Sequence, residues 1–260
     1  MIQSVVKALK IMESFSPAEP RLSLHTISQR LDMPKSTTHN LLNTLVAAGY
    51  IEKVDGDQYA LGTAIVELTQ NVRVNVELRD RAAPLLRRLA DSSHESVYLT
   101  VREGRHVLYL YAIESSQRLV ARTAVGERVE MHCTSVGKAT LAFLPPQEVD
   151  RLYKDVVLTR HTANTIVDLN TLIQELSATH ARGYSVDDQE HEENVFCVGA
   201  PIIDERGVVL GACSVSGTDP AIVGSRLVLI ATSVAQTAQE ISRHMGYIPS
   251  RGSIARVAAQ

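Results

Sequence analysis

The most informative stretch of the sequence is residues 24–61, which read LHTISQRLDMPKSTTHNLLNTLVAAGYIEKVDGDQYAL. Apolar residues recur at helical spacing over residues 24–31, which predicts a helix there. The following Asp-Met-Pro predicts a tight turn, because proline disfavours helix at the residue before it and suits the start of the next helix. A further helix is predicted over residues 35–48. It should end before Gly49, since glycine is a common residue just after a helix.

The elements on either side complete a small DNA-binding pattern. Residues 5–15 show a helical pattern that ends before Pro17. After Gly49, two short β-type runs at 50–54 and 59–61 flank an Asp-Gly turn, which predicts a hairpin. A helix, a helix-turn-helix and a hairpin in this order are typical of a winged helix. We therefore predict a winged helix-turn-helix DNA-binding domain over residues 1–61.

One face of the helix predicted at residues 35–48 is polar. A helical projection places Ser36, Asn40 and Asn43 opposite the leucines. Such side chains bond phosphates and base edges, and asparagine pairs well with adenine. A solvated helix face would look the same, but the preceding turn and the following hairpin favour DNA contact. The residues predicted to contact DNA are Lys35, Ser36, Thr37, His39, Asn40 and Asn43 on the helix and Lys53 on the hairpin.

The charge of this region bears on how it would bind DNA. The chain has a net charge of -3, whereas residues 1–61 hold equal numbers of basic and acidic side chains. Because phosphate neutralisation supplies most non-specific affinity, one neutral domain should bind DNA weakly. Two copies on a palindromic operator would overcome this weakness. We therefore expect a homodimer or a larger assembly.

Beyond residue 61 the pattern is that of an α+β domain. A helical, arginine-rich stretch over residues 63–92 should be interrupted at Pro84. The predicted parts are a linker helix at 62–83, a second domain at 84–247 and a flexible tail at 248–260. Strands are predicted at 96–101, 107–113, 118–123, 198–203 and 208–215, and helices at 141–153, 169–182 and 222–245.

General features of the chain bear on its cellular compartment. With 45% hydrophobic and 21% charged residues, the composition excludes disorder and fibres. Cys133, Cys197 and Cys213 form no CxxC, so neither a disulfide framework nor a zinc knuckle is predicted. Lys7 and Lys10 interrupt the amino-terminal apolar residues, which is unlike a secretory signal. No apolar run approaches the roughly 20 residues of a membrane span. We expect a cytoplasmic protein without membrane contact.

A small-residue loop in the second domain is a candidate anion site. Residues 131–139 read MHCTSVGKA, which is similar to a phosphate-binding loop. It lacks two required residues, because His132 stands where glycine is needed and Ala139 where serine or threonine is needed. Backbone N–H groups at the start of the following helix could still hold a carboxylate. An ordinary helix start is the alternative.

Two later segments carry further polar side chains. Residues 187–193 read DDQEHEE, which suits a metal site, a carboxylate pair or a solvated acidic loop. Ser214 and Ser216 alternate along a predicted strand, so their hydroxyls face the same side. The two hydroxyls either line a polar pocket or face solvent.

An alternative function, that of an enzyme, would depend on Cys197. Cys197 is either a thiolate nucleophile, assisted by His132 or His191, or a small buried side chain. The interpretation of Cys197 as a nucleophile predicts a cysteine-dependent hydrolase. It leaves the winged helix unexplained, and no motif joins the base to the nucleophile. We therefore expect no enzyme and no catalytic residues.

Several widely separated motifs occur in register over residues 1–247. They are SVVKALKIMESF at residues 4–15, LDMPKST at 31–37, LVAAGYI at 45–51, HCTSVGKA at 132–139, DDQE at 187–190, CVGAPI at 197–202 and SVSG at 214–217. Together they resemble the IclR family of bacterial transcriptional regulators.

This resemblance implies a winged helix-turn-helix joined by a linker helix to a GAF-like effector-binding domain. Members of the family are typically dimers, often dimers of dimers, and bind palindromic operators as repressors or activators. The implied function is a regulator of a catabolic operon that responds to a small organic acid, often an aromatic one. The resemblance makes Cys197 a pocket wall, not a nucleophile. The effector-binding positions that it implies are Ser135, Val136, Asp187, Cys197, Ser214 and Ser216.

The chain also departs from the family pattern. Gln189 and His191 stand in an otherwise acidic motif, and the bulky Val136 lies beside the anion loop. These departures leave the identity of the effector open. Some relatives bind zinc in this pocket, and His132, Asp187 and Cys197 would be its ligands here. We expect no metal and no other cofactor.

Overall fold

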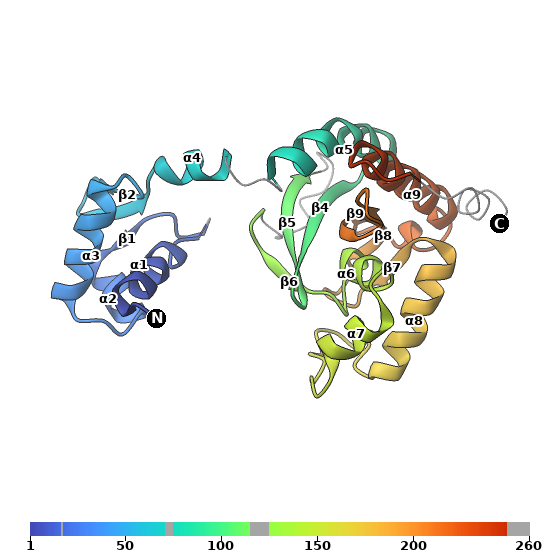
Figure 1. The fold of residues 1–260 in the computed structure, drawn as a ribbon, viewed down its shortest axis with the longest axis horizontal. Coiled ribbons are helices and arrows are strands. Elements are labelled where there is room, and N and C mark those ends of the chain that lie inside the picture. The colour runs from blue at the N-terminus through green and yellow to red at the C-terminus, as the bar shows by residue number, and fades with distance from the viewer. Residues whose placement is uncertain (17, 71–74, 115–124, 249–260) are drawn as a thin grey trace. The chain divides into compact units, whose positions relative to one another are not determined.

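The computed structural model describes residues 1–16, 18–70, 75–114 and 125–248. The chain divides into two compact units, Met1–Val76 and Glu77–Gln260 (Figure 1). One hydrophobic core lies in the first unit and two lie in the second. Each unit therefore has the buried apolar surface that a separate domain needs.

A helix-turn-helix forms the centre of the first unit. Its helices are α1 (Gln3–Glu13), α2 (Leu24–Arg30) and α3 (Lys35–Ala47). The Ser23 hydroxyl caps α2 by accepting a 3.1 Å hydrogen bond from the Thr26 N–H. The chain then turns at Asp32, and α3 begins after Pro34. Beyond α3, Gly49 has a φ of 77°, a left-handed geometry that glycine adopts without strain. The predicted helix-turn-helix is confirmed.

A small sheet completes the first unit. The predicted hairpin forms between β2 (Ile51–Val54) and β3 (Gln58–Leu61), with Val54 opposite Gln58. β1 (Leu22–Ser23) pairs with the other edge of β3. The sequence did not predict β1, because two residues are too few to show an alternating pattern. The core beneath consists of Ile11, Leu22, Ile27, Met33, Leu42, Leu45, Ile51 and Tyr59.

The helices after residue 61 differ from the prediction. They are α4 (Ala64–Gln70), a π-helical turn at Asn75–Arg79 and α5 (Asp80–Ser93). The predicted interruption at Pro84 is wrong, since Pro84 lies inside α5. Proline is tolerated best near the start of a helix, and buried leucines of α5 hold this one in place.

The boundary between the compact units lies ahead of residue 84. Leu78 and Ala82 are fully or almost fully buried in the core of the second unit. Part of the segment predicted as a linker helix at 62–83 therefore packs with the second unit. Residues 71–74 of that segment and most of the predicted tail at 248–260 lie outside the described residues.

The second unit is built on an antiparallel sheet with the strand order β6-β5-β4-β9-β8-β7. Four of the predicted strands are confirmed, with small shifts at their ends, and β6 and β7 are additional. The strand predicted at 118–123 lies outside the described residues. The strands are β4 (Ser96–Glu103), β5 (His106–Ile113), β6 (Arg128–Glu130), β7 (Ser185–Asp188), β8 (Phe196–Ile203) and β9 (Val209–Gly217).

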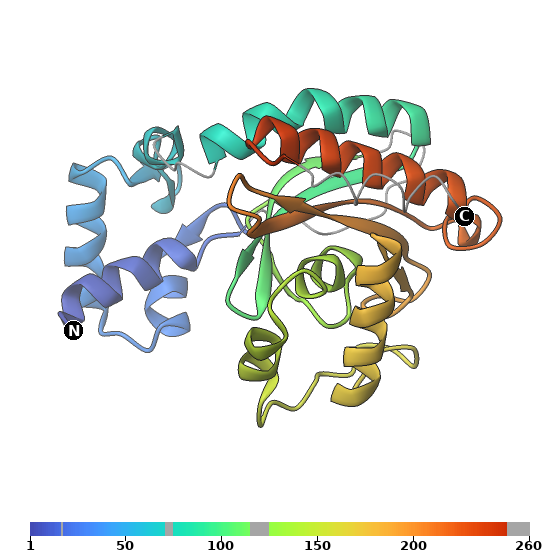
Figure 2. The ribbon, with the colours of Figure 1, turned by 45° about the vertical axis from the view of Figure 1, so that its right-hand side comes forward.

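Helices cover both faces of this sheet. In Figures 1 and 2, α5 and α9 (Leu227–His244) lie along one face. The other face carries α6 (Ser135–Leu141), α7 (Pro146–Tyr153) and α8 (Leu169–Arg182). A separate apolar core fills each side of the sheet. The predicted α+β class is confirmed.

Two predicted helices have other boundaries in the structure. The helix predicted at 141–153 is wrong, because α6 ends at Leu141 and α7 begins only at Pro146. Pro146 forces the residue before it into an extended conformation, and Pro145 has a ψ of 135°. The helix predicted at 222–245 is preceded by a separate 3-10 turn at Pro220–Ile222 and begins at Leu227.

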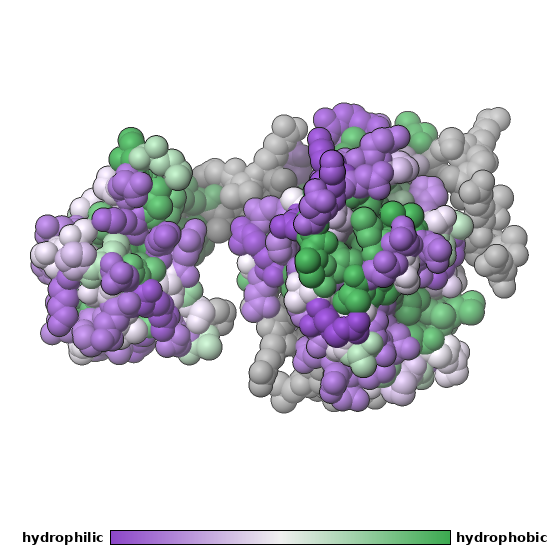
Figure 3. Space-filling model, turned by 90° about the horizontal axis from the view of Figure 1, so that it is seen from below, coloured by the Kyte–Doolittle hydropathy of each residue, from purple (hydrophilic) through white to green (hydrophobic). Residues whose placement is uncertain are grey.

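The surface is mixed in character. Figure 3 shows hydrophilic side chains over much of the visible face of each unit, together with exposed hydrophobic areas. Exposed hydrophobic residues include Val5 and Leu9 in the first unit and Val157 and Val228 in the second. Within the described part of the chain, no helix is both long and apolar enough to cross a membrane.

Candidate functional sites

The predicted DNA-reading face of α3 is exposed. Thr38, Leu42 and Leu45 point into the core of the first unit. On the other side Lys35, Ser36, His39, Asn40 and Asn43 are exposed, while Thr37 is half-buried. Among the described residues, no side chain caps the amino terminus of α3. Its first N–H groups therefore have no acceptor within the helix and can bind a phosphate.

Local contacts leave the two asparagines available. The Nδ2 atom of Asn43 lies 3.4 Å from Nδ1 of His39, near the limit for a hydrogen bond. Thr44 donates its hydroxyl to the backbone carbonyl of Asn40, a contact that does not use the Asn40 amide. Both side-chain amides can therefore turn toward base edges.

Lys53 on the hairpin has a partner within its own unit. Its ammonium group lies 2.7 Å from a carboxylate oxygen of Asp57. The hydrogen bond that Lys53 donates to this carboxylate raises the pKa of Lys53, and the same bond lowers the pKa of Asp57. A phosphate would have to compete with Asp57 for this exposed lysine.

The candidate anion loop in the second unit ends in a capped helix start. Helix α6 begins at Ser135, inside the segment 131–139. The Thr134 hydroxyl accepts a 3.2 Å hydrogen bond from the Gly137 N–H. The N–H groups of Ser135 and Val136 have no acceptor within α6, because they belong to its first turn.

Close packing holds this helix start in place. A Cβ atom on Gly137 would lie 2.3 Å from backbone atoms of Met131, so only glycine fits there. The Ser185 hydroxyl donates a 2.6 Å hydrogen bond to the Ser135 carbonyl. Strand β7 and the loop after β6 thus fix the direction of the first turn of α6.

A polar pocket opens beside this helix start. Its cavity volume is about 30 Å³, about twice what one water molecule needs. The predicted residues Ser135, Asp187, Cys197, Ser214 and Ser216 line it together. Val136 does not line it, because its side chain is buried in the core beneath the sheet. The other lining residues are Tyr98, Tyr109, Thr134, His191, Glu192 and Val195.

Asp187 is the buried carboxyl group of the pocket. Its side chain accepts a 2.8 Å hydrogen bond from the Glu190 N–H. Burial raises the pKa of Asp187 to about 7, although that hydrogen bond opposes the shift. A carboxyl group with this pKa is partly protonated at neutral pH, so it can donate a hydrogen bond to an acid.

Cys197 does not have the surroundings of a nucleophile. Its sulfur lies 3.0 Å from the Ser216 hydroxyl, and burial raises the pKa of the thiol well above its usual range. The Nδ1 atom of His191 lies 3.7 Å from the sulfur of Cys133. A neutral thiol is a poor nucleophile, so the hydrolase reading of Cys197 loses its chemical basis.

Two tyrosines of the pocket were missed by the sequence reasoning. Tyr98 and Tyr109 pack edge to face with ring centres 5.5 Å apart. Burial raises the pKa of Tyr98 to about 12, and its hydroxyl makes no hydrogen bond of normal geometry with the described residues. Tyr98 lies opposite Ser214 in the β4–β9 pair. Sequence alone could have found it only if that strand pairing had been known.

A buried ion pair anchors the segment that carries His191 and Glu192. Lys138 of α6 is almost completely buried, and its ammonium group contacts the Glu190 carboxylate. Glu175 of α8 lies 3.9 Å from the same ammonium group. The acidic segment is therefore tied to α6 and is not the freely solvated loop that the sequence also allowed.

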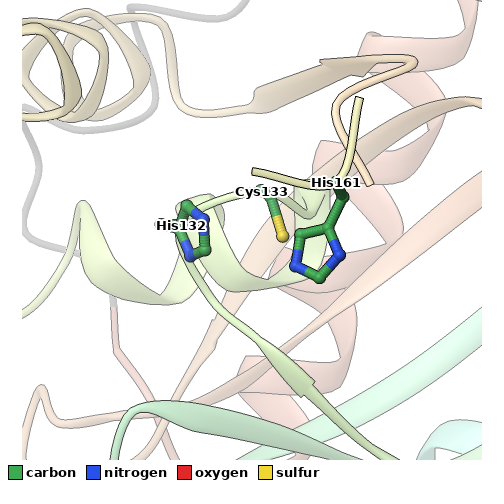
Figure 4. Close-up of side chains that lie close together, drawn as sticks. All are labelled: His132, Cys133 and His161. Carbon is green, nitrogen blue, oxygen red and sulfur yellow. The ribbon is translucent and has the colours of Figure 1, made fainter. Parts of the chain in front are cut away.

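The three zinc ligands that the resemblance implied do not form one group of donors among the described residues. The group of three donors that could hold a metal there is His132, Cys133 and His161, with one donor atom of each within 4.8 Å of the others (Figure 4). Asp187 and Cys197 are not part of this group. His161 carried no signal in the sequence, because it stands alone in a segment without a motif.

Comparisons with known proteins agree with this architecture. The model of the IclR helix-turn-helix domain matches residues 4–55, and that of the bacterial transcriptional regulator IclR C-terminal domain matches residues 70–243. The HTH-type transcriptional regulator XynR of Escherichia coli is 30% identical over 248 residues, which cover 95% of this chain and 98% of XynR.

Solved structures have the same fold. The Thermotoga maritima IclR structure matches with a TM-score of 0.81 and 28% identity, covering 95% of this chain and all of that one. An IclR homologue from Microbacterium hydrocarbonoxydans, solved with 4-hydroxybenzoate, matches with a TM-score of 0.85 and 22% identity. That match covers 94% of this chain and 99% of the homologue.

Proposed function

The chain belongs to the IclR family of bacterial transcriptional regulators, and we propose that its effector is a small organic acid. It is a DNA-binding regulator and not an enzyme. We propose further that the genes it controls belong to a catabolic operon. The acid would bind in the pocket beside α6 and change the affinity of the protein for its operator.

The observation that carries this proposal is the set of donors around one cavity. The N–H groups of Ser135 and Val136 have no acceptor within α6 and lie at the end of the loop beside the pocket. The buried Tyr98 hydroxyl lacks a partner of normal geometry among the described residues. Ser214 and Ser216 add two hydroxyls. A carboxylate accepts such bonds and would satisfy donors that are otherwise costly to bury.

The size and lining of the cavity limit the effector. A cavity of about 30 Å³ suits a carboxylate group, and the rest of a larger acid would require movement of the walls. Tyr98 and Tyr109 offer aromatic faces to such a ligand. The structural neighbour from Microbacterium hydrocarbonoxydans was solved with 4-hydroxybenzoate, which supports an aromatic acid as one candidate.

DNA recognition is proposed to use α3 in the major groove of a palindromic operator. The contacts would come from Lys35, Ser36, Thr37, His39, Asn40 and Asn43, and Lys53 would contact the phosphate backbone of the DNA. The exposure of this face and the free first turn of α3 support this assignment. The equal numbers of acidic and basic residues in 1–61 favour two copies over one.

The proposal is tested by thermal unfolding of the full chain with a panel of small carboxylic acids, including 4-hydroxybenzoate. An acid at 100 times its Kd should raise the unfolding free energy by about 2.7 kcal/mol. Tyr98→Phe should weaken that acid about tenfold or more, because a charged hydrogen bond contributes about 1.5–3 kcal/mol.

A matched control is Tyr153→Phe. Tyr153 is also buried with an unpartnered hydroxyl among the described residues, but it does not line this pocket. Its variant should keep the affinity of the unmodified chain. Equal affinity in Tyr98→Phe, or no stabilisation by any acid in the panel, would contradict the proposal.

A further inference from the structure

A cluster of nitrogen and sulfur donors lies next to the effector pocket. It consists of His132, Cys133, His161 and His191, and is called the histidine–cysteine cluster below. His132 and Cys133 are almost completely buried, while His161 is partly exposed. One donor atom from each of the first three lies within 4.8 Å of the others (Figure 4). These side chains come from three separate loops.

Hydrogen bonds orient two of the imidazole rings. The Nε2 atom of His132 lies 2.9 Å from the Thr159 carbonyl oxygen, and that of His161 lies 2.9 Å from a Glu130 carboxylate oxygen. Because these oxygens accept, each Nε2 atom carries the proton and each Nδ1 atom keeps its lone pair. Metal-binding histidines commonly have such an arrangement, with the second ring nitrogen bonded to a carbonyl or carboxylate.

His191 supplies a fourth donor. Its Nδ1 atom lies 3.7 Å from the sulfur of Cys133, and its ring centre lies 4.9 Å from that of His161. In a tetrahedral zinc site, Zn–S and Zn–N bonds of about 2.3 and 2.0 Å put sulfur and nitrogen about 3.5 Å apart. The Cys133–His191 pair is close to this spacing. The donor atoms of His132, Cys133 and His161, which lie within 4.8 Å of one another, would have to approach by at most about 1.5 Å.

We propose that the histidine–cysteine cluster binds one Zn²⁺ ion per chain. The donor set is three imidazoles and one thiolate, which suits zinc, whereas Mg²⁺ and Ca²⁺ require oxygen ligands. On binding, the S–H bond of Cys133 breaks, the proton passes to solvent and the thiolate sulfur bonds the metal. No oxidant or reductant is needed.

The position of this site gives zinc a structural role. Cys133 precedes α6, His161 lies in the segment between α7 and α8, and His191 follows β7. One ion would join these three segments. His191 also lines the effector pocket, so the site fixes one wall of that pocket without using Asp187 or Cys197.

The test is titration of the full chain with Co²⁺ as a spectroscopic probe, followed by Zn²⁺. We expect one Co²⁺ per chain, with the visible bands of a tetrahedral complex and a near-ultraviolet thiolate-to-metal band. Zn²⁺ should displace it, and millimolar Mg²⁺ should not. Cys133→Ser should remove the thiolate band, and His161→Gln or His191→Gln should weaken binding about tenfold or more.

Matched variants distinguish metal binding by the cluster from misfolding and from metal binding in the effector pocket. His161 is partly exposed, so loss of binding in His161→Gln with unchanged unfolding excludes misfolding. Cys213→Ser and His180→Gln, both outside the cluster, should bind as the unmodified chain does. Loss of the thiolate band in Cys197→Ser would overturn the proposal in favour of the pocket. A thiolate band that persists in Cys133→Ser would also overturn the proposal. So would the absence of stoichiometric metal binding by the full chain.

Discussion

Lys138 has the largest fully buried side chain among the described residues. Its ammonium group contacts Glu190, while the Glu190 Oε2 atom has no partner in the described part of the chain. A buried charge is costly without its partner, although a complete pair often contributes little net stability. The lysine therefore holds the acidic segment against α6. This explains why α6 contains one lysine and no other charged residue.

Replacing Lys138 by methionine should be strongly destabilising. Lys138→Met leaves the Glu190 carboxylate buried without its cation, which should lower the unfolding free energy by about 3–5 kcal/mol. Urea unfolding measures this loss. The double variant Lys138→Met with Glu190→Gln should recover much of it, because no charge is left unpaired. A loss below about 1 kcal/mol in the single variant would show that Lys138 is not needed to compensate Glu190.

Helix α3 separates its structural and functional sides. Thr38, Leu42 and Leu45 are buried, whereas Asn40 and Asn43 lie on the exposed side. Substitutions on the exposed side should therefore change DNA binding without changing the fold. This separation of a buried side from an exposed polar side is expected of a helix that recognises DNA, and it distinguishes such a helix from a purely structural one.

The variant Asn40→Ala with Asn43→Ala tests this helix. Each asparagine that pairs with a base contributes about 1–3 kcal/mol of discrimination, so the double variant should lose specific retention by at least about tenfold. The measurement is a gel shift at fixed salt, with DNA selected in vitro by the unmodified chain. Asn170→Ala, an exposed asparagine of α8, is the matched control. Retention equal to the control would rule out recognition by this face.

At the scale of the whole molecule, exposed apolar side chains support self-association. Val5 and Leu9 of α1 are 52% and 48% exposed, and their spacing places them on the same face of the helix. Val66 of α4 is 60% exposed within the same compact unit. Covering these side chains in a dimer would bring two neutral DNA-binding domains together, which is what weak single domains require.

Disrupting this apolar face should separate the assembly. Light scattering should give twice or four times the chain mass of 28.4 kDa for the unmodified protein. Val5→Glu with Leu9→Glu should lower that mass and weaken binding to a palindromic site about 100-fold or more, because the second contact is lost. Val157→Glu, at a position 90% exposed in the second unit, should change neither. An unchanged mass in the α1 variant would exclude this face from the interface.

The first unit was predictable from local sequence because its signals are local. The Asp-Met-Pro turn, Gly49 after α3 and the Asp-Gly hairpin each act within a few residues. The pocket was predicted only in part. Family motifs led to Ser135, Asp187 and Cys197, while Tyr98 and Tyr109 had no such signal.

Tertiary structure alone decided which distant side chains meet. Cys197 lies opposite Ser216 through the register of the neighbouring strands β8 and β9, and Tyr98 lies opposite Ser214 because β4 pairs with β9, more than 100 residues further along the chain. Shifting such a register by one residue would turn every side chain to the other face of the sheet. The histidine–cysteine cluster likewise joins three loops that share no sequence pattern. Local chemistry specifies helices and turns, whereas long-range packing decides which loops and strands lie side by side, and so where the pocket and the cluster form.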